Sequence, residues 1–441
     1  MPRSQSEDGR RTFAVIPGGP QPGEPPPSPS QKSLRGLDWF VFCVADVQTG
    51  FGPFVAVYLT TQKWTQVDIG LVLSVAGLVG LAGQIPGGAL VDAVRSERLL
   101  AGLAIAAIAL AALTYAAFPI FPVVLAAAVL HAAASCVLGP AIAAISLGLV
   151  GHAAVGERLG RNARFQSIGN GLAAGAMGAC GYFFSARAVF IVTALLLVPT
   201  LLALRRIAPG EINPERAHGG ALPPAEKRSP AEFLSLLRNR PLLTFAGCIM
   251  LFHLANAAML PMMATVLTTQ SSEWATLLIA MCIIVPQCVV AVISPWVGRR
   301  SQSWGRKPLL LVGLAAMSLR GLLFGTVTNP QLVVAVQLLD GLTAAVIGVM
   351  VPLIIADVTR GTGHFNLGQG VVGTMTGLGA AASTTLAGYM TQYLNSQIAF
   401  LGLAGIGIIA VLAAWALMPE TRPESGKDKS AAGPNRPPGN P

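Results

Sequence analysis

The sequence predicts an all-α membrane protein with twelve transmembrane helices in two pseudo-symmetric six-helix bundles. Of its 441 residues, 53% are hydrophobic and 11% are charged, whereas soluble domains carry about 25% charged residues. The mean hydropathy is +0.63. Cutting the chain where charges, prolines and turn residues interrupt the apolar runs leaves twelve segments, most of them near the ~20 residues that a bilayer requires. These observations exclude an ordinary soluble enzyme.

Six expected spans lie on either side of the longest polar interval. They cover residues 37–60, 68–91, 98–118, 121–149, 163–184, 188–206, 241–268, 275–298, 307–327, 331–357, 367–391 and 397–418. We therefore expect a disordered Pro-rich tail over 1–36, an N-terminal bundle over 37–206, a linker over 207–240, a C-terminal bundle over 241–418 and a second tail over 419–441. The stretches PFVAVYLTTQ (53–62) and PMMATVLTTQ (261–270) share their Pro and TTQ, which indicates an internal repeat.

The basic residues predict the orientation. If the N-terminus is inside, all 29 Lys and Arg except Lys63, Arg187 and Arg320 fall in cytoplasmic segments or tails, as basic residues of membrane proteins do. The net charge of +10 is then a topological signal, and we expect no nucleic-acid partner. We predict an integral multi-pass protein of the cell (inner or plasma) membrane with both termini cytoplasmic.

Two loops carry the strongest motif. Gly88, Asp92 and Arg95 follow span two, and the loop after span eight holds the set Gly298, Gln302, Gly305, Arg306 and Lys307. With the 6+6 plan, these loops resemble the G-x-L-x-D-R-x-G-R-[RK] loop of the major facilitator superfamily over residues 37–422. The resemblance implies cytoplasmic gating loops in which a carboxylate meets basic side chains and helix termini of the neighbouring bundle. Topological retention is the alternative role of the basic residues.

Ionisable residues inside the spans are functional candidates, because a charge is costly there. They are Asp46, His131, His253, Arg320 and Asp340, with Gln48, Asn256 and Gln337 as polar neighbours on the cavity helices. The resemblance implies that spans one, four, seven and ten line a central cavity. We expect the Asp and His residues to bind solute and exchange protons; neutral interhelical hydrogen bonding is the alternative for either His. Arg320 is expected to pair with a carboxylate, with Asp340 as a candidate, or with a helix C-terminus. Gln84, Asn170 and Gln287 are candidates for lateral gates or for interhelical hydrogen bonds.

The resemblance implies a secondary active transporter of a small solute that works by rocker-switch alternating access. We expect proton coupling. Glycines of span five and the segment 337–341 resemble exporter motifs and favour efflux. A facilitative uniporter or an uptake permease is the near alternative, and a nontransporting membrane sensor is the alternative of another class. No HExxH, GxSxG or Walker motif supports an enzyme. The six cysteines lie in apolar runs, so we expect no metal, no cofactor and no disulfide scaffold. The expected partners are the solute, protons and lipid, and the chain is expected to be a monomer.

Overall fold

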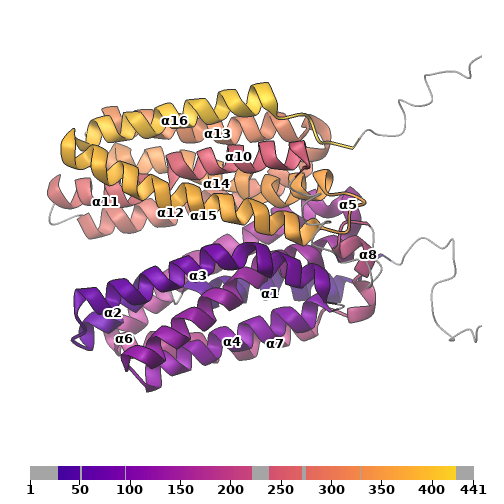
Figure 1. The fold of residues 1–441 in the computed structure, drawn as a ribbon, viewed down its shortest axis with the longest axis horizontal. Coiled ribbons are helices and arrows are strands. Elements are labelled where there is room, and N and C mark those ends of the chain that lie inside the picture. Colours follow the sequence, from indigo (N-terminus) through magenta and orange to yellow (C-terminus); the bar gives the residue numbers. More distant parts are fainter. Residues whose placement is uncertain are drawn as a thin grey trace, which may run out of the picture.

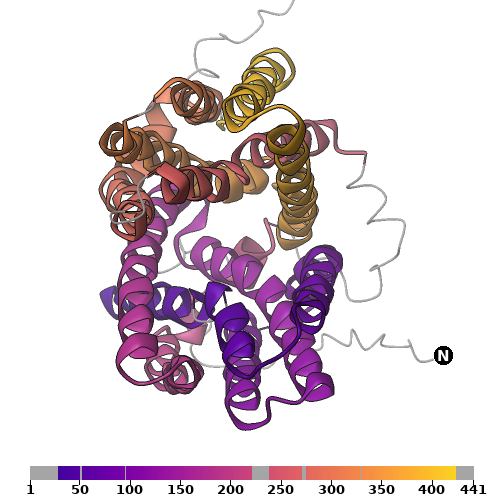
Figure 2. The same ribbon diagram turned by 90° about the vertical axis from the view of Figure 1, so that its left-hand side faces the viewer.

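Two groups of long helices lie side by side in the structure, a computed structural model that describes residues 28–49, 52–94, 96–220, 238–270, 275–327 and 329–423. The first group contains α1 (Gln31–Thr49), α2 (Gly52–Thr61), α3 (Gln66–Ala93), α4 (Glu97–Ala117), α5 (Phe121–Phe183), α6 (Ala186–Leu195) and α7 (Leu197–Arg205). The second contains α10 (Arg240–Asn256), α11 (Met259–Gln270), α12 (Ala275–Trp304), α13 (Arg306–Thr326), α14 (Pro330–Val358), α15 (Phe365–Tyr393) and α16 (Ser396–Leu417). Figure 2 shows the same two groups from the end that holds α2, α6 and α11.

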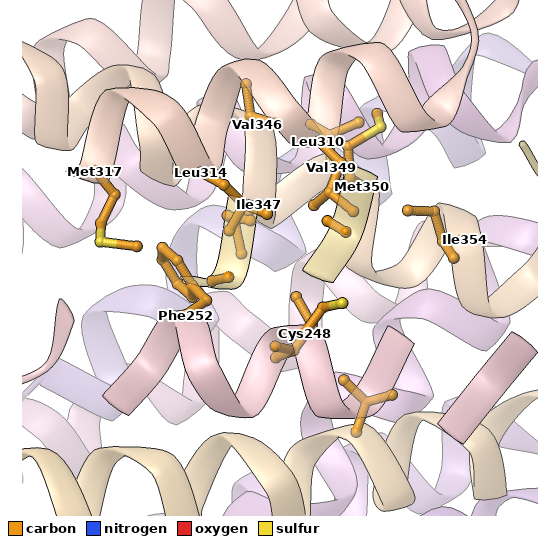
Figure 3. Packing of buried hydrophobic residues seen from close by; sticks show 14 of the residues in the cluster. Cys248, Phe252, Leu310, Leu314, Met317, Val346, Ile347, Val349, Met350 and Ile354 are labelled. Atoms are coloured by element: carbon orange, nitrogen blue, oxygen red, sulfur yellow. The ribbon is translucent and has the colours of Figure 1, made fainter. Parts of the chain in front are cut away.

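Each group has its own buried apolar core. One core is built from residues between Leu37 and Ala217. The other joins residues between Leu242 and Met418 and also includes Ala143, Leu147, Val155 and Leu159 of α5. In the second core, Cys248 and Phe252 of α10 face Leu314 of α13 and Met350 of α14 (Figure 3). We call these groups the N-terminal and the C-terminal bundle.

Small polar residues start most of the helices. The side chains of Thr65, Ser96, Ser185, Asn239 and Asn395 each accept a hydrogen bond from a backbone N–H in the first turn of the helix that follows. Such N-caps satisfy donors that a helix leaves without an internal partner. The caps therefore fix where the chain turns back between spans.

Helix α5 contains two expected spans, because the chain reverses inside it at Gly151. This residue has φ 69° and ψ 174°, a conformation that favours glycine. By length and hydropathy, nine described segments are suited to cross a membrane, and one of them is the whole of α5. Together with α1 and α2 and with α15, they are consistent with twelve spans.

Several spans differ from the expected boundaries. Helix α1 begins at Gln31, inside the expected tail, because the Ser30 hydroxyl accepts from the backbone of Ser33 and the Glu211 carboxylate accepts from Ser30 at 2.9 Å. The second half of α5 is helical from just after Gly151, well before the expected start at 163. Spans six and seven are each divided, at Leu196 and at residues 257–258.

The two ends of the molecule differ in what they carry. At one end lie the 3-10 helix η1 (Pro209–Glu211) and α8 (Pro214–Ala217), which belong to the expected linker (right in Figure 1). The ends of α3 and α12 and the start of α15 lie there too. We call it the linker end, and we call the opposite end, with α2, α6 and α11, the hairpin end. Residues 1–27, 221–237 and 424–441, which hold most of the expected tails and part of the expected linker, lie outside the described residues.

Candidate functional site

Asp92 joins the two bundles at the linker end. Its buried carboxylate, one residue before the end of α3, accepts hydrogen bonds from the backbone N–H of Leu367 at 2.7 Å and from the side-chain amide of Asn366 at 2.8 Å. Asn366 and Leu367 form the first turn of α15, where free N–H groups and the helix dipole favour a negative charge. The carboxylate thus meets a helix terminus of the other bundle, and the side chain it contacts there is a neutral amide instead of the expected basic residue.

Glycines bring the backbones of the two bundles into contact beside the Asp92 carboxylate. A Cβ on Gly88 would overlap the carbonyl oxygen of Asn366, and a Cβ on Gly298 would overlap that of Gly156. The two contacts are related by the internal repeat, since Gly298 follows Gly88 and Asn366 follows Gly156 by the same 210 positions. The loop glycines of the motif therefore permit close approach at two equivalent seams, α3 with α15 and α12 with α5.

The second seam has a neutral counterpart of Asp92. Gln302 follows Asp92 by the same interval, and its side-chain amide donates to the carbonyl oxygen of Ala153 at 3.2 Å. Deeper along this seam, Arg164 donates to the carbonyl of Ala291 at 2.7 Å, and the Ser167 hydroxyl donates to the Gln287 amide oxygen at 2.5 Å. These hydrogen bonds connect α5 with α12 from the linker end to about the middle of the helices.

Nearer the hairpin end, glycines on the same faces of α3 and α5 have no neighbouring helix against them. Gly77 lies on the face of α3 that carries Gly88, and Gly178 lies on the face of α5 that carries Gly156. A Cβ on Gly77 or Gly178 would meet no atom within 4 Å. The helices that touch at the linker end are therefore apart toward the hairpin end.

A cavity of about 280 Å³ lies between the bundles. It is lined by α1 and α5 from the N-terminal bundle and by α14 and α15 from the C-terminal bundle, and its polar side chains are Gln48, Ser135, Asn162, Gln166 and Gln369. Among the described lining residues none is ionisable. Amides and a hydroxyl both donate and accept hydrogen bonds, so this cavity suits a small solute that does the same.

His131 and Gln84 line a neighbouring cavity of about 380 Å³ inside the N-terminal bundle. The Nε2 of His131 lies 3.4 Å from the hydroxyl of Ser135, a residue that also lines the central cavity. A Cβ on Gly373 of α15 would contact the Gln84 amide oxygen. His131 thus lies one layer behind the central cavity, while Gln84 reaches the α3–α15 seam.

A buried ion pair lies within the C-terminal bundle. The guanidinium of Arg320 on α13 binds the carboxylate of Asp340 on α14 and donates to the Asn256 amide oxygen on α10 at 2.9 Å. Arg320 is 1% exposed. The amide of Gln337 is fully buried beside the Cys282 thiol. Asn256 is the last residue of α10, so the pair is connected to the break between α10 and α11.

The remaining expected residues lie as follows. The ring of His253 packs edge-on against Phe252, and Asn170 is a half-buried residue of α5. The side chain of Asp46 and the whole of Arg95 lie outside the described residues.

The Gly305, Arg306 and Lys307 motif acts within one bundle. Gly305 has φ 97° and precedes α13, whose first N–H groups, on Arg306 and Lys307, donate to the Glu420 carboxylate. The buried Arg306 guanidinium donates to Asp357 at 2.8 Å and to the carbonyl of Ser301 at 2.6 Å. In the described structure, Arg306 therefore connects α12, α13 and α14 of its own bundle and makes no contact with Asp92.

Sequence reasoning missed a second buried charge cluster, at the linker end of the N-terminal bundle. Asp38 on α1 binds the guanidinium groups of Arg158 and Arg161 on α5. Arg158 also donates to Asn162 at 2.8 Å, and Asn162 donates to Ser146 at 2.7 Å. The signal was available, because Arg158 and Arg161 have the spacing of one helix face. The expected spans instead place both residues in the connection between residues 149 and 163.

A polytopic helical protein with two repeated bundles, a cavity between them and a seal at one end has the architecture of a membrane transporter. The sequence profile of the Major Facilitator Superfamily matches residues 39–319 and 248–440. An uncharacterized MFS-type transporter of Mycobacterium tuberculosis, found in strains CDC 1551 and H37Rv, is 40% identical over 395 residues, which cover 88% of this chain and 93% of the relative. The chain therefore belongs to the Major Facilitator Superfamily, and it is a membrane transporter and not an enzyme.

Solved structures share the fold at low sequence identity. FucP, an MFS transporter in the outward conformation, matches with a TM-score of 0.69 and 15% identity over 87% of this chain and 97% of its own. The proton:xylose symporter XylE gives 0.66 and 13% over 89% and 96%. The human organic anion transporter MFSD10 gives 0.65 and 15% over 87% and 99%.

Proposed function

We propose that this protein is a secondary active transporter that moves a small solute by rocker-switch alternating access, with the linker end in the cytoplasm. The observation that carries the proposal is a polar cavity between the bundles, closed toward the linker end by two seams related by the repeat. The similarity to FucP, whose structure is in the outward conformation, supports an outward-facing arrangement. The amide lining supports a solute that exchanges hydrogen bonds.

Proton coupling is the second part of the proposal. It is supported by the Arg320–Asp340 pair, in which the Asp340 side chain keeps 22% of its surface exposed while Arg320 is enclosed. A carboxylate that is paired with a buried cation and is itself only partly buried can change its protonation between two conformations. Asp46, His131 and His253 remain the further candidates. Export is the direction we favour, on the glycines of span five and the segment 337–341.

The experiment begins with thermal-shift screening of the purified protein against metabolites and drugs at two pH values. A solute that stabilises the protein is then loaded into proteoliposomes, and its flux is measured under imposed pH gradients of both signs. Flux that follows the gradient, and that is uncoupled or abolished in Asp340→Asn or Asp46→Asn protein shown to be folded, supports proton coupling. Asp68→Asn, at a half-buried aspartate in the first turn of α3, is the matched control.

Each competing function has its own outcome. Saturable flux that ignores the pH gradient in the wild type indicates a facilitative uniporter. Solute binding without any flux indicates the nontransporting sensor. Equal gradient dependence in the wild type and both variants removes Asp46 and Asp340 from the coupling mechanism.

A further inference from the structure

Residues 217–219 of the linker contact the C-terminal bundle through their backbone and the N-terminal bundle through the His218 side chain. Their backbone faces the C-terminal bundle: the Ala217 carbonyl accepts from the Asn366 amide at 3.3 Å, the His218 carbonyl from the backbone of Phe365 at 3.4 Å, and the Gly219 carbonyl from the backbone of Gly361 at 2.6 Å. The His218 side chain points the other way, into the N-terminal bundle. This segment therefore spans the closed linker end.

The His218 ring is surrounded by oxygen acceptors. It is 1% exposed, its Nδ1 lies 2.6 Å from the carbonyl of Pro214, and its Nε2 lies 3.3 Å from the carbonyl of Val91 and 3.7 Å from the Glu97 carboxylate. A carbonyl oxygen only accepts hydrogen bonds, and a neutral imidazole has a single N–H. Both ring nitrogens donate only in the imidazolium form, so the closed arrangement fits the protonated ring.

The charges around His218 favour the same form. Glu97 at the start of α4 is buried, and its Oε1 has no hydrogen-bond partner among the described residues. Asp92 of α3, whose carboxylate binds the first turn of α15, is also buried and interacts electrostatically with His218. Arg216 and Arg360 are the positive charges that would disfavour protonation. Arg216 of α8 lies against Gly151 of α5, and both arginines lie near His152 of that helix. His218 is the basic side chain that interacts with both carboxylates.

We propose that His218 is a proton-binding gate residue that stabilises the closed linker end when it is protonated. Opening the linker end separates residues 217–219 from at least one bundle, and withdrawing an imidazolium from a buried carboxylate is more costly than withdrawing a neutral ring. Histidine titrates within the physiological range. Acidification on the linker side therefore holds the transporter closed there, and alkalinisation allows it to open. This inference rests on the proposed alternating-access function and adds a sensor outside the solute cavity.

The test measures the gate without any solute. Spin labels are placed at Leu99 on α4 and Ser303 on α12, exposed positions at the linker end of the two bundles, in a full-length background with the six native cysteines replaced. Distance distributions in lipid nanodiscs give the ratio of closed to open molecules. One proton taken up on closing changes this ratio by at most about tenfold per pH unit, so between about pH 6 and about pH 8 we expect a fall of roughly tenfold or more.

Three variants decide the outcome. His218→Gln should remove most of this pH dependence, and Glu97→Gln should weaken it, because the carboxylate facing the ring is lost. His152→Gln, at a half-buried histidine of the same end, is the matched control and should retain it. A pH-independent ratio in the wild type, or an unchanged dependence in a folded His218→Gln protein, would overturn the role of His218 and leave the transport proposal standing. A linker end that never opens, with or without solute, would instead overturn alternating access.

Discussion

The Arg320 guanidinium illustrates how this protein keeps a charge inside an apolar bundle. It lies among α10, α13 and α14 with oxygen partners on Asp340 and Asn256. Burying an isolated charge is costly, and removing one partner of a buried pair leaves that cost uncompensated. The pair therefore adds little net stability to the folded protein, whereas loss of either member destabilises it.

At the residue scale, Asp340→Asn should therefore destabilise the protein by about 3 to 5 kcal/mol, because Arg320 keeps its charge and loses its carboxylate. Replacing both residues, as Arg320→Met with Asp340→Leu, should recover most of the loss. Denaturant unfolding in mixed micelles gives the free energies. Asp68→Asn, at a half-buried aspartate that accepts from the Thr65 hydroxyl in the first turn of α3, is the control and should change stability by about 1 kcal/mol or less. A single variant as stable as the wild type would show that the pair is not structurally required.

At the scale of elements, the α3–α15 seam depends on the absence of a side chain at one position. Gly88→Val would place a Cβ into the carbonyl of Asn366, and forced overpacking costs about 1 to 3 kcal/mol. We expect the closed fraction at the linker end to fall about tenfold, as measured by the Leu99 and Ser303 labels. Gly77→Val, on the same face of α3 but with no neighbour within 4 Å, should leave it unchanged. Equal effects of the two variants would mean that the seam is not the gate.

The sequence predicted this seam better than it predicted the cavity. The spacing of Gly88 and Asp92 is local and matches a family motif, so a contact between the bundles at this loop could be anticipated, and its role as a gate stays a prediction. Gln166 and Gln369 line the cavity but lie within a few residues of the expected starts of their spans. Before Gln166, the expected connection contains Arg158 and Arg161, yet the helix runs through both. Asp38 binds these two guanidinium groups, and the carbonyl of Ala291 accepts from Arg164.

His218 could not have been predicted by the same reasoning. It lies in a polar linker without apolar periodicity, and its partners Val91 and Glu97 are more than a hundred residues earlier in the chain. Only the packing of the linker across the end of α3 brings these groups together. Likewise, the pairing of Arg320 with Asp340 depends on how α13 and α14 are rotated against each other, which hydropathy does not specify.

At the scale of the whole molecule, the two seams are equivalent by the repeat but unequal in charge. The α3–α15 seam carries Asp92 and the α12–α5 seam carries Gln302. A charge-assisted hydrogen bond is stronger than a neutral one. The α3–α15 seam, which carries the charge, is therefore the stronger of the two, and it lies on the side where His218 also lies.

Accessibility of the central cavity gives a test of the whole arrangement. A cysteine at Ser135, which lines both the central and the N-terminal cavity, should react with a membrane-impermeant thiol reagent added on the hairpin side. It should be protected on the linker side, because the seams are closed there. Adding Gly88→Val should open the second route, whereas Gly77→Val should not. The measurement uses sealed vesicles of each orientation with the native cysteines replaced, and a cysteine at exposed Ser303 reports on the linker side. Equal labelling from both sides in the parent protein would contradict a cavity sealed at one end, and with it the alternating-access mechanism.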